Sequence, residues 1–199
     1  MCSTHKHKRA KARIDGILSV ARPQPPYRIK FLTLTIPNTD TIRGGIDVLR
    51  ASFKKLRNTK RWKRLVRGGL YVIEVKRGKQ GWHPHLHILM ESRYYKWEQL
   101  LKQWMRCSPG RGVWIEDVPT KQAVSYISKY VNKAPASITD TREYSYDLRG
   151  TRMFQTFGTW HTIEADLPRP RYKCPDCGQS CWMVVWDTID AITMRAGAP

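Results

Sequence analysis

Apolar and polar positions recur along this chain with two different periods, and the change of period predicts where strands give way to helices. Alternating branched and aromatic residues between turn signals predict strands at about residues 27–36, 69–77, 82–90, 113–115 and 152–160. Apolar residues spaced three or four apart predict helices over residues 46–66, 97–105 and 120–133.

The order of these elements predicts the fold class. Strands and helices alternate along the chain, but only the turn Gly78-Lys79-Gln80-Gly81 separates the second strand from the third. So short a connection makes the two strands an antiparallel hairpin. We therefore expect an α+β fold with a central, mainly antiparallel sheet and flanking helices.

Three segments are expected along the chain. Residues 1–26 are predicted to be a flexible basic arm and linker, because lysines and arginines crowd residues 6–13 and prolines follow at 23, 25 and 26. Residues 27–160 form the folded domain, and residues 161–199 form a C-terminal extension. The boundaries follow the first predicted strand and the end of the last one.

The charge balance points to a polyanionic partner. Lysine and arginine number 36 against 16 acidic residues, which gives a formal net charge of +20. Such an excess costs self-repulsion in the folded chain, and nucleic acid compensates for it because each neutralised phosphate releases counterions. No apolar run is long enough to span a bilayer, no secretory signal is present, and five cysteines are an odd number for disulfides. We expect a cytoplasmic protein with reduced thiols.

The third predicted strand carries a candidate metal site. In the run HPHLHIL, His83, His85 and His87 project to the same side of the strand, because successive side chains alternate between faces. The apolar residues between and after them make this strand part of the core rather than a histidine-rich surface. Imidazoles gathered on one such face are natural ligands for a divalent cation.

The hairpin offers a carboxylate to the same site. A turn centred between Lys79 and Gln80 places Glu74 opposite His85, at a Cβ separation of about 4.5–5.5 Å, unless a bulge shifts the register. We expect Glu74, His85 and His87 to be the metal ligands, with His83 as the less favoured alternative. Two imidazoles and one carboxylate leave positions open for a phosphate oxygen, which suits Mg²⁺ or Mn²⁺.

The helix AVSYISKYVNK, residues 123–133, carries a candidate nucleophile. Tyr126 and Tyr130 are four residues apart and therefore share a helix face with Lys129. Nearby ammonium groups favour the phenolate, which is the attacking form of tyrosine, and offset charge in the transition state. An ordinary amphipathic helix with packed tyrosines and solvated lysines is the alternative interpretation.

Together these motifs resemble those of the HUH endonucleases, which initiate rolling-circle replication of plasmids and single-stranded DNA phages. The family has an apolar FLTLT-type strand, a His-apolar-His strand and a Tyr-x-x-Lys helix. The chain presents them in that order at Phe31–Thr35, His85–Leu89 and Tyr126–Lys129. The resemblance implies a ferredoxin- or RRM-like HUH domain over residues 27–160 that nicks and rejoins single-stranded DNA through a 5′-phosphotyrosine.

The same resemblance implies a role for each site residue. His85 and His87 would be metal ligands, Glu74 the acidic ligand, Tyr126 the nucleophile and Lys129 a contact of the scissile phosphate. The run YISKYVNK is similar to the two-tyrosine helix of isometric phage replication proteins. By this similarity, Tyr130 would alternate with Tyr126 in cleaving and rejoining the strand. Single-tyrosine enzymes place a glutamate one turn before the tyrosine, where this chain has Gln122, which cannot act as a base.

The C-terminal extension contains a second candidate metal element. Cys174, Cys177 and Cys181 begin like a zinc knuckle, with CPxCG as a tight thiolate turn. A structural zinc needs four ligands, and His161 or Cys107 would complete the set, with Cys2, His5 and His7 as remoter candidates. Ordinary buried thiols are the alternative.

Two other functions fit parts of the pattern. A single-strand transposase of the same chemistry would also place its histidines before its tyrosine. A non-catalytic, zinc-dependent DNA-binding regulator would use the cysteines and the basic arm instead. No GxxxxGK[ST] motif occurs, so a replication initiator of this kind would work in the host cytoplasm with origin DNA, a separate helicase and a polymerase.

Overall fold

The computed structural model describes residues 3–21, 23–130, 138–163, 182–184 and 194–196, and the chain divides into two compact units. Residues 1–166 form the first unit. The second unit, residues 167–199, contains an antiparallel pair formed by β6 (Trp182–Val184) and β7 (Met194–Ala196). Among the described residues no helix is both long and apolar enough to cross a membrane.

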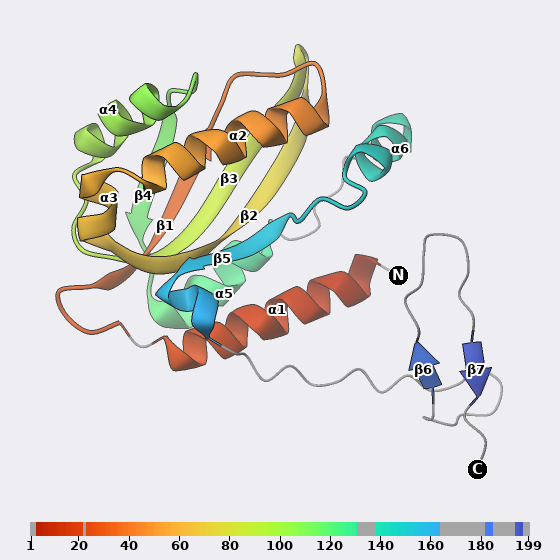
Figure 1. Ribbon diagram of the computed structural model, residues 1–199, viewed down its shortest axis with the longest axis horizontal. Helices are drawn as coiled ribbons and strands as arrows, with labels where there is room; N and C mark the ends of the chain where they lie inside the picture. Colours follow the sequence, from red (N-terminus) through yellow and green to blue (C-terminus); the bar gives the residue numbers. More distant parts are fainter. Residues whose placement is uncertain (1–2, 22, 131–137, 164–181, 185–193, 197–199) are drawn as a thin grey trace. The chain divides into compact units, whose positions relative to one another are not determined.

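An open five-stranded sheet organises the first unit (Figure 1). Its strands, in the spatial order β4-β1-β3-β2-β5, are β4 (Gly112–Asp117), β1 (Arg28–Thr35), β3 (Gly81–Ser92), β2 (Val66–Gly78) and β5 (Phe154–Gly158). Every neighbouring pair is antiparallel. The predicted α+β class with an antiparallel sheet and flanking helices is therefore confirmed.

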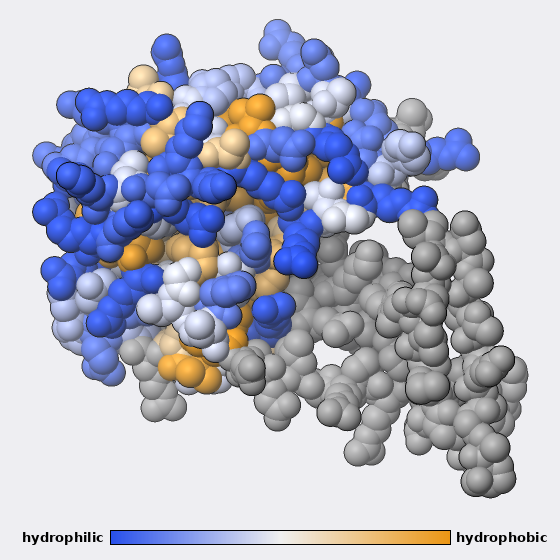
Figure 2. Space-filling view, viewed as in Figure 1, coloured by the Kyte–Doolittle hydropathy of each residue, from blue (hydrophilic) through white to orange (hydrophobic). Residues whose placement is uncertain are grey.

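Helices cover both faces of this sheet (Figure 1). One face carries α2 (Ile42–Arg57), α3 (Lys60–Leu65) and α4 (Trp97–Cys107), and the other carries α1 (Ser3–Val20) and α5 (Thr120–Ser128). The helix α6 (Ile138–Asp147) contacts α2, and the 3₁₀ turn η1 (Thr159–Thr162) follows β5. The surface seen in Figure 2 is mostly hydrophilic, as the high charge requires.

Side chains alternate between two cores, one on each face of the sheet. In β1, Leu32 and Leu34 join the core under α2, while Ile29 and Phe31 join the core under α1 and α5. This alternation follows from the pleat, which sends successive side chains to opposite faces. The β1 strand is thus buried from both sides, in agreement with its nearly continuous apolar sequence.

The expectation of a flexible arm at residues 1–26 needs correction. Residues 3–20 form α1, and Ile14, Ile17 and Leu18 of its last turns are buried in the core beneath α5. These apolar residues are spaced three and four apart, so they form one stripe on a helix. The high density of charge earlier in the segment concealed this stripe.

Substitution within α1 tests this packing. Ile17→Ala is expected to lower the free energy of unfolding by about 2–5 kcal/mol, because it deletes a fully buried branched side chain and leaves a cavity. Val20→Ala in the same helix should change it by less than about 0.5 kcal/mol, since Val20 is 61% exposed. Urea unfolding of both variants checks this, and equal stabilities would show that α1 does not pack on the sheet.

Three predicted elements differ in extent from the structure. The helix expected over residues 46–66 is two helices, α2 and α3, because Thr59 caps a new start by accepting the backbone N–H of Trp62. The helix expected to reach residue 133 ends at Ser128. The last strand begins at Phe154 and turns into η1 after Gly158, whose φ of 60° favours glycine.

Candidate active site

The hairpin register brings the candidate metal ligands onto one face of the sheet. Glu74 pairs with His85 and Val72 pairs with His87, so the predicted register is confirmed without a bulge at this point. On the other side of β3, Thr33 of β1 pairs with His87. All of these side chains lie on the face that α1 and α5 cover.

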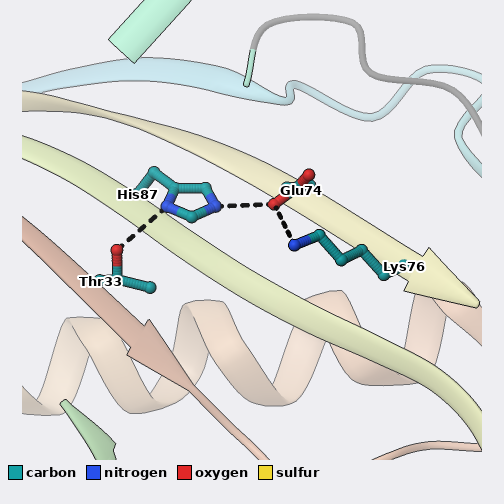
Figure 3. Close-up of polar contacts among 4 residues, drawn as sticks. All are labelled: Thr33, Glu74, Lys76 and His87. Atoms are coloured by element: carbon teal, nitrogen blue, oxygen red, sulfur yellow. Dashed lines mark hydrogen bonds and ion pairs between the residues drawn. The ribbon is translucent and has the colours of Figure 1, made fainter. Parts of the chain in front are cut away.

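His87 is the most constrained residue of the site (Figure 3). It is 4% exposed, its Nε2 lies 2.9 Å from Glu74 Oε2, and its Nδ1 lies 3.1 Å from Thr33 Oγ1. Which ring nitrogen donates depends on the tautomer. With Nε2 protonated, Nε2–H donates to Glu74 and Nδ1 accepts from the Thr33 hydroxyl, whereas a cation on Nε2 would leave Nδ1–H to donate to Thr33 Oγ1. The two contacts fix the orientation of the ring.

Glu74 also has a cationic neighbour. Lys76 Nζ lies 3.5 Å from the same Oε2 atom that contacts His87. Glu74 is almost fully buried, whereas Lys76 is half exposed. A buried carboxylate needs such partners, because desolvation without them is costly. This arrangement therefore holds a negative charge inside the sheet face, next to an imidazole.

His83 and His85 extend the row of imidazoles towards the turn. The His85 ring lies parallel to that of His87 with centroids 5.9 Å apart, and edge-on to His83 at 4.5 Å. Burial, together with the neighbouring His83 and Lys76, lowers the pKa of His85 to about 4. His85 is therefore neutral near pH 7, with a lone pair available to a ligand. Burial also lowers the pKa of His83, whose Nδ1 contacts Asn38 Oδ1.

Both tyrosines of the predicted motif reach this face around Phe31. Tyr130 stacks on His87 with ring centroids 3.6 Å apart and lies 5.8 Å from Phe31. Tyr126 packs edge-on against Phe31 at 5.4 Å, and the Lys129 ammonium lies 5.0 Å from the Tyr126 ring centroid. Although α5 ends at Ser128, Tyr130 N–H still donates to Ile127 O, so the chain stays turned towards the sheet.

The spacing of Glu74 Oε2 and His87 Nε2 would admit a divalent cation in place of the hydrogen bond between them. Two neighbouring ligands of an octahedral ion at about 2.1 Å each are separated by about 3.0 Å, which is close to the observed 2.9 Å. Within the described residues, however, no three His, Cys, Asp or Glu side chains already converge on one point. The His85 ring lies parallel to the His87 ring, with centroids 5.9 Å apart.

Sequence reasoning missed three side chains of this site. Phe31 belongs to the FLTLT run, but its place between the two tyrosines depends on how α5 docks. Thr33 reaches His87 only because β1 pairs with β3 across a long connection. Lys76 had a local signal, since it lies two residues after Glu74 and thus on the same face of β2.

The predicted zinc element falls largely outside the described residues. Cys174, Cys177 and Cys181 are not described, and neither is Cys2 or the side chains of His5 and His7. Of the other candidates, His161 Nδ1 contacts Thr156 Oγ1 at 3.2 Å, and Cys107 is a half-buried free thiol at the end of α4. Burial raises the pKa of the Cys107 thiol. The zinc element stays a prediction.

Comparison with known proteins identifies the family. Residues 1–179 match a family model described as "Replication protein". No curated protein and no solved structure is detectably similar to the chain. The match spans α1, the whole sheet and α5, and thus the complete candidate site. The chain therefore belongs to this family of replication proteins, the rolling-circle Rep proteins.

Proposed function

We propose that this protein initiates rolling-circle replication by nicking and rejoining single-stranded DNA at an origin, with a tyrosine as nucleophile. The observation that carries the proposal is the shared face on which Tyr126 and Tyr130 flank Phe31 beside the Glu74–His87 pair. Family membership supports replication rather than transposition or regulation as the biological role. The net charge of +20 supports binding to DNA.

The proposed reaction is a transesterification at one phosphodiester. The Tyr126 phenolic oxygen forms a bond to phosphorus as it loses its proton, and the bond from phosphorus to the 3′-oxygen breaks. The products are a 5′-phosphotyrosine on the enzyme and a 3′-hydroxyl, which takes up a proton and can prime a polymerase. The Lys129 ammonium, which lies over the Tyr126 ring, would offset the charge of the phosphate.

Glu74, His85 and His87 would hold Mg²⁺ or Mn²⁺, and the bound ion would polarise the scissile phosphate as a Lewis acid. Thr33 and Lys76 position this set, because Thr33 fixes the His87 ring and Lys76 contacts the Glu74 carboxylate. His83 lies two residues before His85, nearer the turn, and its Nδ1 contacts Asn38 Oδ1. It is therefore the less suitable ligand.

Two tyrosines would allow the enzyme to terminate replication by transfer rather than by hydrolysis. After one round of synthesis Tyr130 would attack the regenerated origin, and the released 3′-hydroxyl would attack the first phosphotyrosine to close a circle. Each step exchanges one phosphodiester for another, so no water is consumed. Gln122, in place of a glutamate before the tyrosine, fits this scheme because it cannot activate water.

Covalent capture tests the proposed function directly. The protein is incubated with Mn²⁺ and end-labelled random single-stranded oligonucleotides, then denatured and separated on a gel. We expect a denaturant-resistant adduct that EDTA prevents and that the Tyr126→Phe/Tyr130→Phe double variant does not form. An adduct of undiminished yield with the double variant, or no adduct with the wild-type protein, would overturn the proposal.

A further inference from the structure

Trp114 is an exposed aromatic side chain on the same sheet face as the candidate site. It lies in β4, the edge strand next to β1, and is 64% exposed. It pairs with Thr33, which in turn pairs with His87. Directly paired residues project to the same face of a sheet. Trp114 therefore stands in one row with Thr33 and His87.

The distance along this row is short. Neighbouring strands are about 4.8 Å apart, so the Trp114 backbone lies about 10 Å from that of His87. A strand of DNA with a phosphate at His87 and the tyrosines would pass Trp114 within a few nucleotides. The tryptophan is thus placed on the approach to the candidate site, at the edge of the sheet.

The β1 and β4 residues beside this row have small side chains. Thr33 and Thr35 of β1 are only partly buried, and Gly112 of β4 lies opposite Thr35. A Cβ atom at Gly112 would come within 1.9 Å of Thr35 Oγ1, so a side chain there would require Thr35 to move. An extended DNA strand can lie across these small side chains, with the exposed Trp114 ring at the end of the row.

We infer that Trp114 binds a base of single-stranded DNA by stacking, and so holds the strand that enters or leaves the nicking site. The inference rests on the proposed function, because it takes the phosphate at His87 as the point from which the strand runs. An indole face accepts any unpaired base, whereas the bases of a duplex already stack on one another. The net charge of +20 favours a nucleic acid over a protein as the occupant.

A second exposed tryptophan supplies the control. Trp97 in α4 is 47% exposed, but its indole N–H donates to Val113 O, and α4 packs on the opposite face of the sheet. It has the same chemistry as Trp114 without the proximity to His87. Trp97→Ala therefore reports what loss of an exposed tryptophan does in general.

The test is equilibrium binding of a labelled oligonucleotide in EDTA, where no nicking occurs. Trp114→Ala is expected to weaken binding of single-stranded DNA by about tenfold or more, the usual effect of losing one stacked base. Trp114→Phe should retain most of the affinity, and Trp97→Ala should bind like the wild type. The dependence of log K on log salt should keep its slope, because no phosphate contact is lost. Duplex binding should not change.

Two outcomes would overturn the inference. One is wild-type affinity of Trp114→Ala for single-stranded DNA, and the other is an equal loss for single-stranded and duplex DNA. Neither depends on a covalent adduct, so the stacking role can fail while nicking is observed. Conversely, stacking can be confirmed if Tyr126 and Tyr130 prove inactive. Circular dichroism of Trp114→Phe and Trp114→Ala verifies that both variants are folded.

Discussion

A Tyr126→Phe variant is expected to lose covalent capture of single-stranded DNA by about a thousandfold or more, since it lacks the oxygen that would bond to phosphorus. The ring stays in place against Phe31, so binding of the DNA should persist. The measurement is the rate of adduct formation with a labelled oligonucleotide under single-turnover conditions. It separates chemistry from binding, which is followed on the same oligonucleotide without metal.

Tyr130→Phe gives the contrasting result. If Tyr130 acts second, this variant still forms the first adduct but fails to transfer the strand and release a joined product. Its ring stacks on His87 at 3.6 Å, whereas Tyr126 packs edge-on against Phe31 at 5.4 Å. Capture that survives in Tyr126→Phe but disappears in Tyr130→Phe would therefore exchange the two roles.

Tyr146→Phe is the matched control for both changes. Tyr146 lies in α6 and is exposed, and no part of the proposed mechanism involves it. The variant should form adduct and joined product at the wild-type rate. A comparable loss of adduct with Tyr146→Phe would mean that the assay responds to the removal of any tyrosine hydroxyl and does not identify the nucleophile.

The parts of the fold that could be predicted from the sequence are those that local contacts determine. The hairpin of β2 and β3 closes through a two-residue turn, so its pattern and length fix the pairing of Glu74 with His85. The pairing of β1 between β3 and β4 joins segments far apart in the chain. No local pattern encodes it, although the burial of β1 on both faces was visible in its apolar run.

The candidate site shows the same division. Which residues share a face followed from the period of the strands, and this part of the prediction is confirmed for Glu74 and the three histidines. Which atoms meet did not follow, because Glu74 reaches diagonally to His87, which is not its directly paired residue. That choice depends on side-chain rotamers and on Thr33 and Tyr130, which arrive from other elements.

The N-terminal helix illustrates why charge can mislead. The segment before Ile14 is dominated by lysine and arginine, which is typical of a disordered arm. A helix of this length gains little stability alone and is fixed by packing of its apolar stripe. Ile14 and Ile17 find that packing only once Leu70, Val72 and Trp160 have been assembled by the sheet and η1.

A Glu74→Gln variant is expected to weaken Mn²⁺ binding by about 100-fold or more and to slow nicking in proportion, if Glu74 is a metal ligand. Glutamine has the same shape and can still accept the His87 N–H, so the hydrogen bond at 2.9 Å and the fold should survive. What is lost is the negative charge, which the hard divalent cation requires. Titration calorimetry with Mn²⁺ measures the affinity of the protein alone.

Lys76→Gln tests whether Glu74 is a metal ligand or only the partner of Lys76 in an ion pair. It removes the Glu74–Lys76 contact by changing Lys76 and not Glu74. If Glu74 serves only to pair with Lys76 and His87, both substitutions remove the Glu74–Lys76 ion pair and neither affects Mn²⁺. If Glu74 holds the ion, Lys76→Gln leaves the carboxylate in place and removes a competing cation, so Mn²⁺ affinity should be unchanged or tighter. His83→Gln should also leave it unchanged, since the His83 ring is held by Asn38. Wild-type Mn²⁺ affinity in Glu74→Gln would remove Glu74 from the ligand set and leave His87 with a purely structural carboxylate.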